Sequence, residues 1–234
     1  MTASGHTAIF VALPAFGGQT ASATSMSLFT LGAFLAMKGI NCAGGTLSHP
    51  DIADARNMFL TMWYHLHPQS THILFVDADM HFPPELVGDM VGFDKPLVGC
   101  VYRKKIDDLS WVGETVPSPE IAVENGFVEM NRIGMGVALI SRGCVEEMIA
   151  KYPELIFDVP PTDDMAVYSM GLRKVMRFFD KIPQGYLNLS EDNSFCDRYR
   201  AIGGKVYANV VHQVGHIGQK EYAGKLMDHA QRAG

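Results

Sequence analysis

The chain has 234 residues, of which 47% are hydrophobic and 19% are charged, and its formal net charge is −6. This length accommodates one large α/β domain or two small ones, and the composition is that of a globular protein rather than a disordered chain. The negative charge excludes a general nucleic-acid-binding protein, because such a protein needs a basic face to displace counterions from phosphates.

The cysteines and the apolar stretches indicate the compartment. Four cysteines lie far apart without a CxxC or Cys/His ligand spacing, and we expect free thiols in a reducing environment: Cys42, Cys100, Cys144 and Cys196. The apolar stretch 8–13 is too short for a signal sequence or a membrane span. Segment 21–37 fits an amphipathic helix better than a spanning one. We therefore expect a soluble, cytoplasmic protein without a transmembrane segment.

Strand and helix patterns alternate through the first hundred residues. Apolar runs predict strands at 8–13, 40–47, 73–76 and 95–102. A first helix is expected at about 22–38 and a third near 84–91. Between them, a second helix is capped by Ser48 or Asp51 and runs to about residue 66. This alternation is typical of a parallel, doubly wound sheet flanked by helices.

The pattern loosens after Tyr102. Residues 107–132 are expected to form a hairpin or an insertion over the sheet face. A strand at 136–140 leads into a helix at about 142–152, and 153–183 is expected to be a long loop. A helix at about 191–202 and a strand at about 205–211 complete the chain. No repeat or linker is evident, so residues 1–234 are interpreted as a single domain.

Two carboxylates, Asp77 and Asp79, directly follow the buried strand 73–76. Side chains at i and i+2 of extended backbone point the same way, so both can face one spot at the strand's carboxyl end. Ligands of open α/β sheets bind at that edge, and paired carboxylates there suit Mg²⁺ or Mn²⁺ on a diphosphate. The alternative is an Asp-rich turn that caps the helix starting near Pro84.

Several short pieces occur in one order along nearly the whole chain. They are Val11-Ala-Leu-Pro14, Ala55-Arg-Asn57, Phe75-Val-Asp-Ala-Asp79, Gly134-Met-Gly136 with Leu139-Ile-Ser-Arg142, Ser190-Glu-Asp192 with Phe195, and His216-Ile-Gly218. This ordered set resembles GT-A-fold nucleotide-sugar glycosyltransferases of small bacterial and phage type, and distantly the fungal mannosyltransferases. The resemblance implies a GT-A-like doubly wound, mostly parallel (mixed) sheet.

The resemblance implies a metal site. Asp79 would bind Mn²⁺ or Mg²⁺ directly, and Asp77 would contact the ribose or the metal. The cation would neutralise charge on the leaving diphosphate. His216 would be the third protein ligand and is favoured over its rival His212, although a lone histidine is more often a surface or core residue.

The resemblance also assigns a nucleotide pocket. Pro14, Ala15 and Phe16 would hold the base, although Phe16 could equally be a core aromatic. Arg56 would pair with phosphate or support Asp77, or it is an ordinary surface residue. Lys220 and the basic residues 103–105 would meet diphosphate charge unless they only face solvent.

The acceptor side is assigned to the later part of the chain. Glu191 and Asp192 would lie beside the acceptor, with Asp192 as general base if the enzyme inverts. The helix dipole alone also favours acids at this helix start. Gly134 and Gly136 would keep the sugar pocket open.

These assignments predict a metal-dependent glycosyltransferase that moves a sugar from a UDP- or GDP-sugar to an unidentified hydroxyl acceptor. Residues 1–102 would form the nucleotide-binding half, and 103–234 the acceptor-side half with a metal-binding C-terminal segment. One alternative is a sugar-phosphate nucleotidyltransferase, although the loop 14–20 lacks the basic residues of that class. Another is a non-catalytic nucleotide-sugar-binding subunit. The lack of an evident acceptor domain leaves room for a homo-oligomer.

Overall fold

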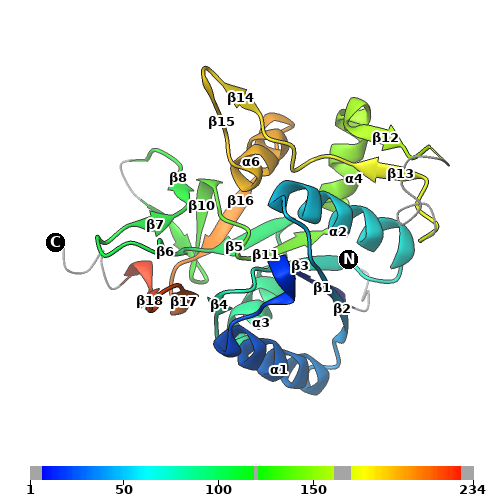
Figure 1. The fold of residues 1–234 in the computed structure, drawn as a ribbon. Helices are drawn as coiled ribbons and strands as arrows, with labels where there is room; N and C mark the ends of the chain where they lie inside the picture. Colours follow the sequence, from blue (N-terminus) through cyan, green and yellow to red (C-terminus); the bar gives the residue numbers. More distant parts are fainter. Residues whose placement is uncertain (1–6, 119–120, 161–169, 228–234) are drawn as a thin grey trace, which may run out of the picture.

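The computed structural model describes residues 7–118, 121–160 and 170–227, which form a mixed sheet with helices on both faces (Figure 1). The main sheet has the order β2-β1-β3-β11-β5-β16-β10-β8, and β9 pairs with β10. Its strands are β1 (Ala8–Pro14), β2 (Asn41–Leu47), β3 (His72–Val76), β5 (Leu97–Cys100), β8 (Glu114–Thr115), β9 (Val123–Glu124), β10 (Phe127–Arg132), β11 (Val137–Ser141) and β16 (Val206–Asn209).

Helices cover both faces of this sheet. Helices α1 (Ser22–Met37) and α3 (Pro84–Phe93) lie on one face; α2 (Ile52–Leu66), α4 (Arg142–Lys151) and α6 (Glu191–Ala201) lie on the other. Alternate residues of β3 therefore enter two different cores. Phe75 packs with Phe179 on the α2 side, whereas Leu74 and Val76 pack on the α1 side. A strand buried on both faces explains the unbroken apolar run of its sequence.

Polar side chains cap the starts of α2, α4 and α6. The Asp51 carboxylate accepts hydrogen bonds from the amides of Ala53 and Asp54, at 2.7 and 3.2 Å, and so caps α2. Ser141 and Ser190 cap α4 and α6 in the same way. Each cap satisfies amide groups that the first helical turn leaves without a partner.

Strand directions confirm the predicted α/β class with a mixed sheet. β2, β1 and β3 run parallel, and β5 runs parallel to β16. β11 is inserted antiparallel between β3 and β5. The sequence does not reveal this insertion, because an apolar run of five residues carries no signal of its direction.

The segment 107–132 contains a hairpin, one of its two expected forms, in which β9 and β10 pair antiparallel. It does not lie over the sheet face, the other expected form, but extends the sheet. β10 pairs with β16 on one side and with β8 on the other. Its inward residue Phe127 stacks on Phe93 of α3 with ring centroids 4.2 Å apart. This long-range contact gives β10 a buried face, and no local pattern encodes it.

Short strands form separate small sheets beside the main sheet. β6 (Tyr102–Arg103) pairs with β7 (Trp111–Val112), and β14 (Pro183–Gln184) pairs with β15 (Leu187–Asn188). β4 (Met80–His81), β17 (Val214–Ile217) and β18 (Glu221–Gly224) form a separate three-stranded sheet. Within the predicted loop 153–183, the short helix η2 (Pro153–Leu155) precedes β12 (Ile156–Asp158), which pairs with β13 (Lys174–Met176); 161–169 lie outside the described residues.

Helix α1 differs from the amphipathic helix expected at 21–37. Its buried stripe of Thr24, Ser27, Leu31 and Leu35 faces the sheet, but its outward face is also largely apolar. In the described part of the chain, no helix combines the length and apolar character needed to cross a bilayer.

Candidate functional site

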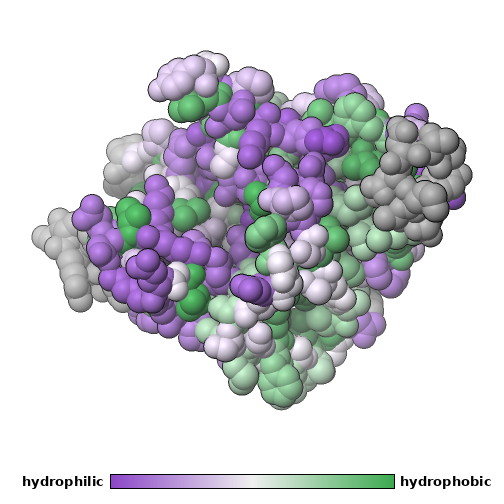
Figure 2. All heavy atoms as spheres, in the orientation of Figure 1, coloured by the Kyte–Doolittle hydropathy of each residue, from purple (hydrophilic) through white to green (hydrophobic). Residues whose placement is uncertain are grey.

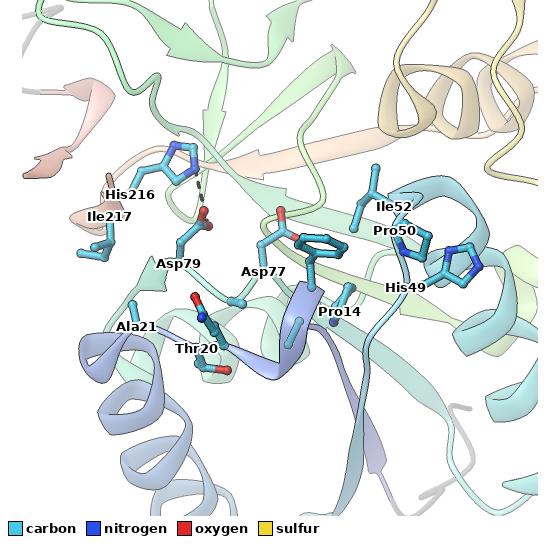
Figure 3. A pocket seen from close by; sticks show the side chains of 14 residues that line it. Pro14, Thr20, Ala21, His49, Pro50, Ile52, Asp77, Asp79, His216 and Ile217 are labelled. Carbon is cyan, nitrogen blue, oxygen red and sulfur yellow. Dashed lines mark ion pairs between the residues drawn. The ribbon is translucent and has the colours of Figure 1, made fainter. Parts of the chain in front are cut away.

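A cleft of about 600 Å³ opens at the carboxyl ends of β1 and β3 (Figure 3). The loop after β1, the segment before α2, the turn after β3 and the strand β17 form its walls. The lining residues are Pro14, Ala15, Phe16, Gln19, Thr20, Ala21, His49, Pro50, Ile52, Asp77, Ala78, Asp79, His216 and Ile217. The structure thus brings together the β1 loop, both aspartates and the late histidine.

Asp77 and Asp79 both line this cleft but contact different partners. β3 ends at Val76, and the backbone then turns, with the Met80 amide donating to the Asp77 carbonyl at 3.2 Å. The expected extended geometry, with both carboxylates at one spot, is therefore wrong. Asp77 turns toward α2, whereas Asp79 turns toward the C-terminal strands.

Arg56 holds Asp77 and Glu191 together beneath the cleft. Its guanidinium donates to both Asp77 oxygens, at 2.8 and 3.0 Å, and to the Glu191 carboxylate. The Arg56 side chain is only 3% exposed. Burial by itself lowers the pKa of Arg56. The nearby negative charges of Asp77, Glu191 and Asp192 raise it by more, so the pKa lies above its usual value. Arg56 is thus a buried support of Asp77 rather than a surface residue.

Asp79 lies between two basic side chains. One oxygen pairs with the Lys105 ammonium, and Oδ1 faces the Nε2 atom of His216 at 3.6 Å (Figure 3). This separation exceeds a hydrogen bond, and Oδ1 is buried without a hydrogen-bond partner. A carboxylate oxygen and an imidazole nitrogen thus face each other across a gap.

The backbone orients the His216 ring. Its Nδ1 lies 3.0 Å from the Arg103 carbonyl, an acceptor, so Nδ1 carries the hydrogen. Burial lowers the pKa of His216, although the Arg103 carbonyl and Asp79 act in the opposite direction. The neutral ring therefore presents a lone pair on Nε2 toward Asp79. Metal-binding histidines are commonly held by such a bond from the other ring nitrogen.

The Asp79–His216 pair fits a divalent cation better than it fits a direct contact. Two electron-pair donors that face each other attract a cation and repel one another. Over the described ranges, no three His, Cys, Asp or Glu side chains already converge as a metal cluster. A cation there would therefore take its remaining ligands from bound phosphate or water, as Mg²⁺ sites commonly do.

Two basic candidates from the sequence lie elsewhere. His212 Nε2 contacts the Asp89 carboxylate on α3 at 2.7 Å. Lys220 pairs with Asp107 and is not among the residues that line the cleft. Lys220 thus lies outside the cleft lining, and Lys105 is the lysine that pairs with Asp79.

The loop after β1 presents Phe16 to the cleft. The Phe16 side chain is 74% exposed, which excludes the alternative of a core aromatic. Gly17 and Gly18 have φ angles of 65° and 70°, which a side chain would oppose. The Gly17 amide donates to Ser48 Oγ at 3.0 Å and ties this loop to the end of β2.

Sequence reasoning missed part of the cleft lining. His49, Pro50 and Ile52 line the cleft, as do Gln19 and Thr20. The available signal was the position of His49 just after a predicted strand, because the carboxyl ends of parallel strands share one edge of the sheet.

Glu191 and Asp192 open α6 with different contacts. Burial raises the pKa of Glu191, which Arg56 only partly offsets. Asp192 Oδ1 accepts hydrogen bonds from the Ser190 hydroxyl and, at 2.8 Å, from the Asn193 amide. Both bonds fall on one oxygen.

Gly134 and Gly136 make room for Tyr102, rather than for a sugar. A Cβ on Gly134 would lie 2.2 Å from the Tyr102 hydroxyl oxygen, and one on Gly136 would lie 2.8 Å from it. The Gly136 amide donates to that hydroxyl at 3.3 Å, and the ring packs edge-on against His216. Tyr102 therefore packs against the His216 ring, a contact that the sequence did not suggest.

Gly134→Ala is expected to destabilise the protein by about 1–3 kcal/mol, because the buried Tyr102 ring cannot move aside. Urea denaturation followed by circular dichroism measures this change. The matched control is Gly92→Ala on α3, where a Cβ meets nothing within 4 Å and should be neutral or stabilising. Equal stability of Gly134→Ala and wild type would contradict this packing.

No family model and no curated protein matches this chain, whereas 74 chains of solved structures do. Protein A197 from STIV matches 94% of this chain and 91% of its own, with a TM-score of 0.52 and 14% identity. A glycosyltransferase involved in the glycosylation of the major capsid of PBCV-1 matches 70% of this chain and 76% of its own, with a TM-score of 0.36 and 12% identity. The first likeness shows a shared fold alone, and the second is weaker.

Proposed function

We propose that this chain is a metal-dependent glycosyltransferase that moves a sugar from a UDP- or GDP-sugar to a hydroxyl acceptor. The observation that carries the proposal is the pair of Asp79 Oδ1 and His216 Nε2, which face each other at 3.6 Å in a cleft at the carboxyl edge of the sheet. This is the edge at which α/β sheets bind nucleotides. The ordered motifs of the sequence support the same activity.

The acidic and basic groups of the cleft suit a diphosphate. Asp79 and His216 would hold Mn²⁺ or Mg²⁺, which when bound neutralises charge on the leaving diphosphate. Lys105, beside Asp79, adds a positive charge at the same place. Lys105 is not itself part of the lining, which contains two aspartates and, among the described residues, no arginine or lysine. A bound cation would supply positive charge within the cleft.

The remaining cleft residues suit the nucleoside. The exposed ring of Phe16 offers a stacking surface for a base, and Pro50 and Ile52 provide an apolar wall. Asp77, fixed by Arg56, presents a carboxylate that can accept hydrogen bonds from ribose hydroxyls.

Asp192 is the proposed general base. Its Oδ1 is held by Ser190 and Asn193, which leaves Oδ2 to accept the proton of an acceptor hydroxyl. Glu191 is committed to Arg56 and acts as a positioning residue.

Calorimetric titration of UDP and of GDP, with and without Mn²⁺, tests the donor site. We expect one of the two nucleotides to bind and to require the metal. The control variant Asp89→Asn changes a carboxylate that contacts His212 on α3 and should bind as the wild type does. Absence of binding for both nucleotides at every metal concentration would refute the proposal.

Asp192→Asn separates catalysis from binding in the same experiment. We expect unchanged nucleotide binding and at least about 100-fold slower hydrolysis or transfer of the donor sugar, because general-base catalysis contributes about 10²–10⁴-fold. Donor turnover is measured by release of UDP or GDP. A wild type that binds nucleotide but never releases it from any donor sugar would instead indicate a binding subunit.

A further inference from the structure

The segment from Thr7 to Pro50 carries one charged side chain, Lys38. It forms one edge of the molecule through β1, α1 and β2. The rest of the chain therefore holds the entire net negative charge. Figure 2 shows apolar and weakly polar residues gathered where Figure 1 draws α1, while hydrophilic residues cover much of the opposite part of the view.

Helix α1 has an apolar stripe that faces away from its own sheet. Met26, Phe29, Ala33 and Met37 follow the spacing i, i+3, i+7, i+11 and are all exposed. The exposed fractions are 58% for Met26, 74% for Phe29 and 80% for Met37. A helix that is apolar on both faces is normally buried on both, so this face lacks the packing that its sequence is suited to.

Strand β2 is an edge strand without protection. It pairs with β1 along all seven residues and has no partner on its other side among the described strands. It contains no charge, no proline and no bulge, and residues 41–46 are exposed. Native edge strands usually carry at least one such device against pairing.

The opposite edge of the sheet shows the contrast. β8 has two residues, and its Glu114 forms an ion pair with Arg132. The neighbouring β9 is equally short and carries Glu124. These short, charged strands discourage pairing, whereas β2 invites it.

A groove of about 400 Å³ joins β2 to α1. Leu28, Leu31 and Gly32 form one wall, and residues 42–45 form the other. Gly44 and Gly45 have no side chains, so Val11 and Leu13 of β1 form the apolar floor. The edge strand and the adjoining side of α1 therefore form one apolar surface. No residue of the exposed stripe lines this groove, but Phe29 precedes Gly32 by one helical turn and so borders it.

We propose that a second copy of this chain docks on this surface, so that the two β2 strands pair and the sides of α1 that border β2 pack across a two-fold axis. The free amides and carbonyls of β2 can bond a second strand, whereas a lipid surface offers no matching row of donors and acceptors. A two-fold contact presents the same patch on both sides. Each chain has a net charge of −6, but this patch lies in the segment 7–50, whose one charged side chain is Lys38. Two copies can therefore meet here without like-charge repulsion.

Light scattering after gel filtration tests the dimer, at chain concentrations from about 1 to 100 µM, a range typical of such contacts. We expect a mass of twice 25.7 kDa for the wild type. Phe29→Lys on α1 and Ala43→Lys in β2 are expected to elute as monomers with unchanged circular dichroism, because both side chains are exposed. The control is Leu187→Lys, an exposed apolar residue on β15 that is 61% exposed, and it should remain dimeric.

Hydrogen exchange locates the contact. The amides of residues 41–47 that point away from β1 should exchange slowly in the dimer and at least about tenfold faster in Phe29→Lys. The amides that bond β1 should be protected in both. A wild type that is monomeric at the highest concentration, or a dimer that persists in both lysine variants, would overturn the proposal. Monomers that sediment with phosphatidylcholine vesicles and lose this binding in Phe29→Lys would also overturn it, in favour of a lipid surface.

Discussion

Arg56→Met is expected to lower the free energy of unfolding by about 3–5 kcal/mol at neutral pH, because it leaves two carboxylates without their buried partner. Asp77 and Glu191 both bond the Arg56 guanidinium, whose side chain is 3% exposed. Methionine fills a similar volume, so the loss reports charge rather than a cavity. Urea denaturation at several pH values measures it.

The pH dependence identifies the cause. Burial already raises the pKa of Glu191 above 4.5, and removal of Arg56 raises it further. Between 4.5 and that raised pKa, the folded variant binds more protons than its unfolded chain, so its stability increases as the pH falls. The deficit relative to wild type should thus be largest near pH 8 and shrink toward about pH 5.

A matched control separates burial from charge. Arg177→Met removes an arginine that also contacts two carboxylates, Asp54 and Asp180, but is 41% exposed. We expect a loss of about 1 kcal/mol or less, because solvent screens this pair. Similar losses in the two variants, or a deficit for Arg56→Met that does not change with pH, would contradict the role assigned to the buried arginine.

Asp79→Asn and His216→Ala are each expected to weaken Mn²⁺ binding by at least about 10–100-fold, since even residues that only orient metal ligands have effects of that size. The electron paramagnetic resonance signal of free Mn²⁺, recorded with the bound nucleotide present, measures the affinity. His212→Ala is the control, because His212 contacts Asp89 on α3. Equal losses for the two histidine variants would contradict the assignment of His216.

The pH profile of this binding follows from the His216 environment. Burial lowers the pKa of His216 below 6.5, and only the neutral ring binds metal. The Mn²⁺ affinity of the wild type should therefore stay constant from about pH 8 to 6.5 and decrease only below the lowered pKa. A Mn²⁺ affinity at pH 6.5 that is already half of its value at pH 8 would indicate an ordinary, solvated histidine.

Much of the fold followed from local patterns. The apolar run of β3 and the cap at Asp51 predicted a buried strand and a helix start that the structure confirms. The place of β10 did not follow, because its buried face depends on stacking with Phe93. The exposed stripe of α1 was missed for a related reason: helical periodicity shows which residues are apolar but not which face is covered.

The candidate site divides in the same way. The sequence by itself determined that Asp77 and Asp79 lie at the carboxyl end of a buried strand, because an unbroken apolar run must be covered on both faces and must end where charge begins. Only the tertiary structure decided that Asp77 turns to Arg56 and Asp79 to Lys105 and His216. These contacts join residues 21 to 137 positions apart, and spacing in the sequence holds no record of which distant side chains the packed sheet brings together.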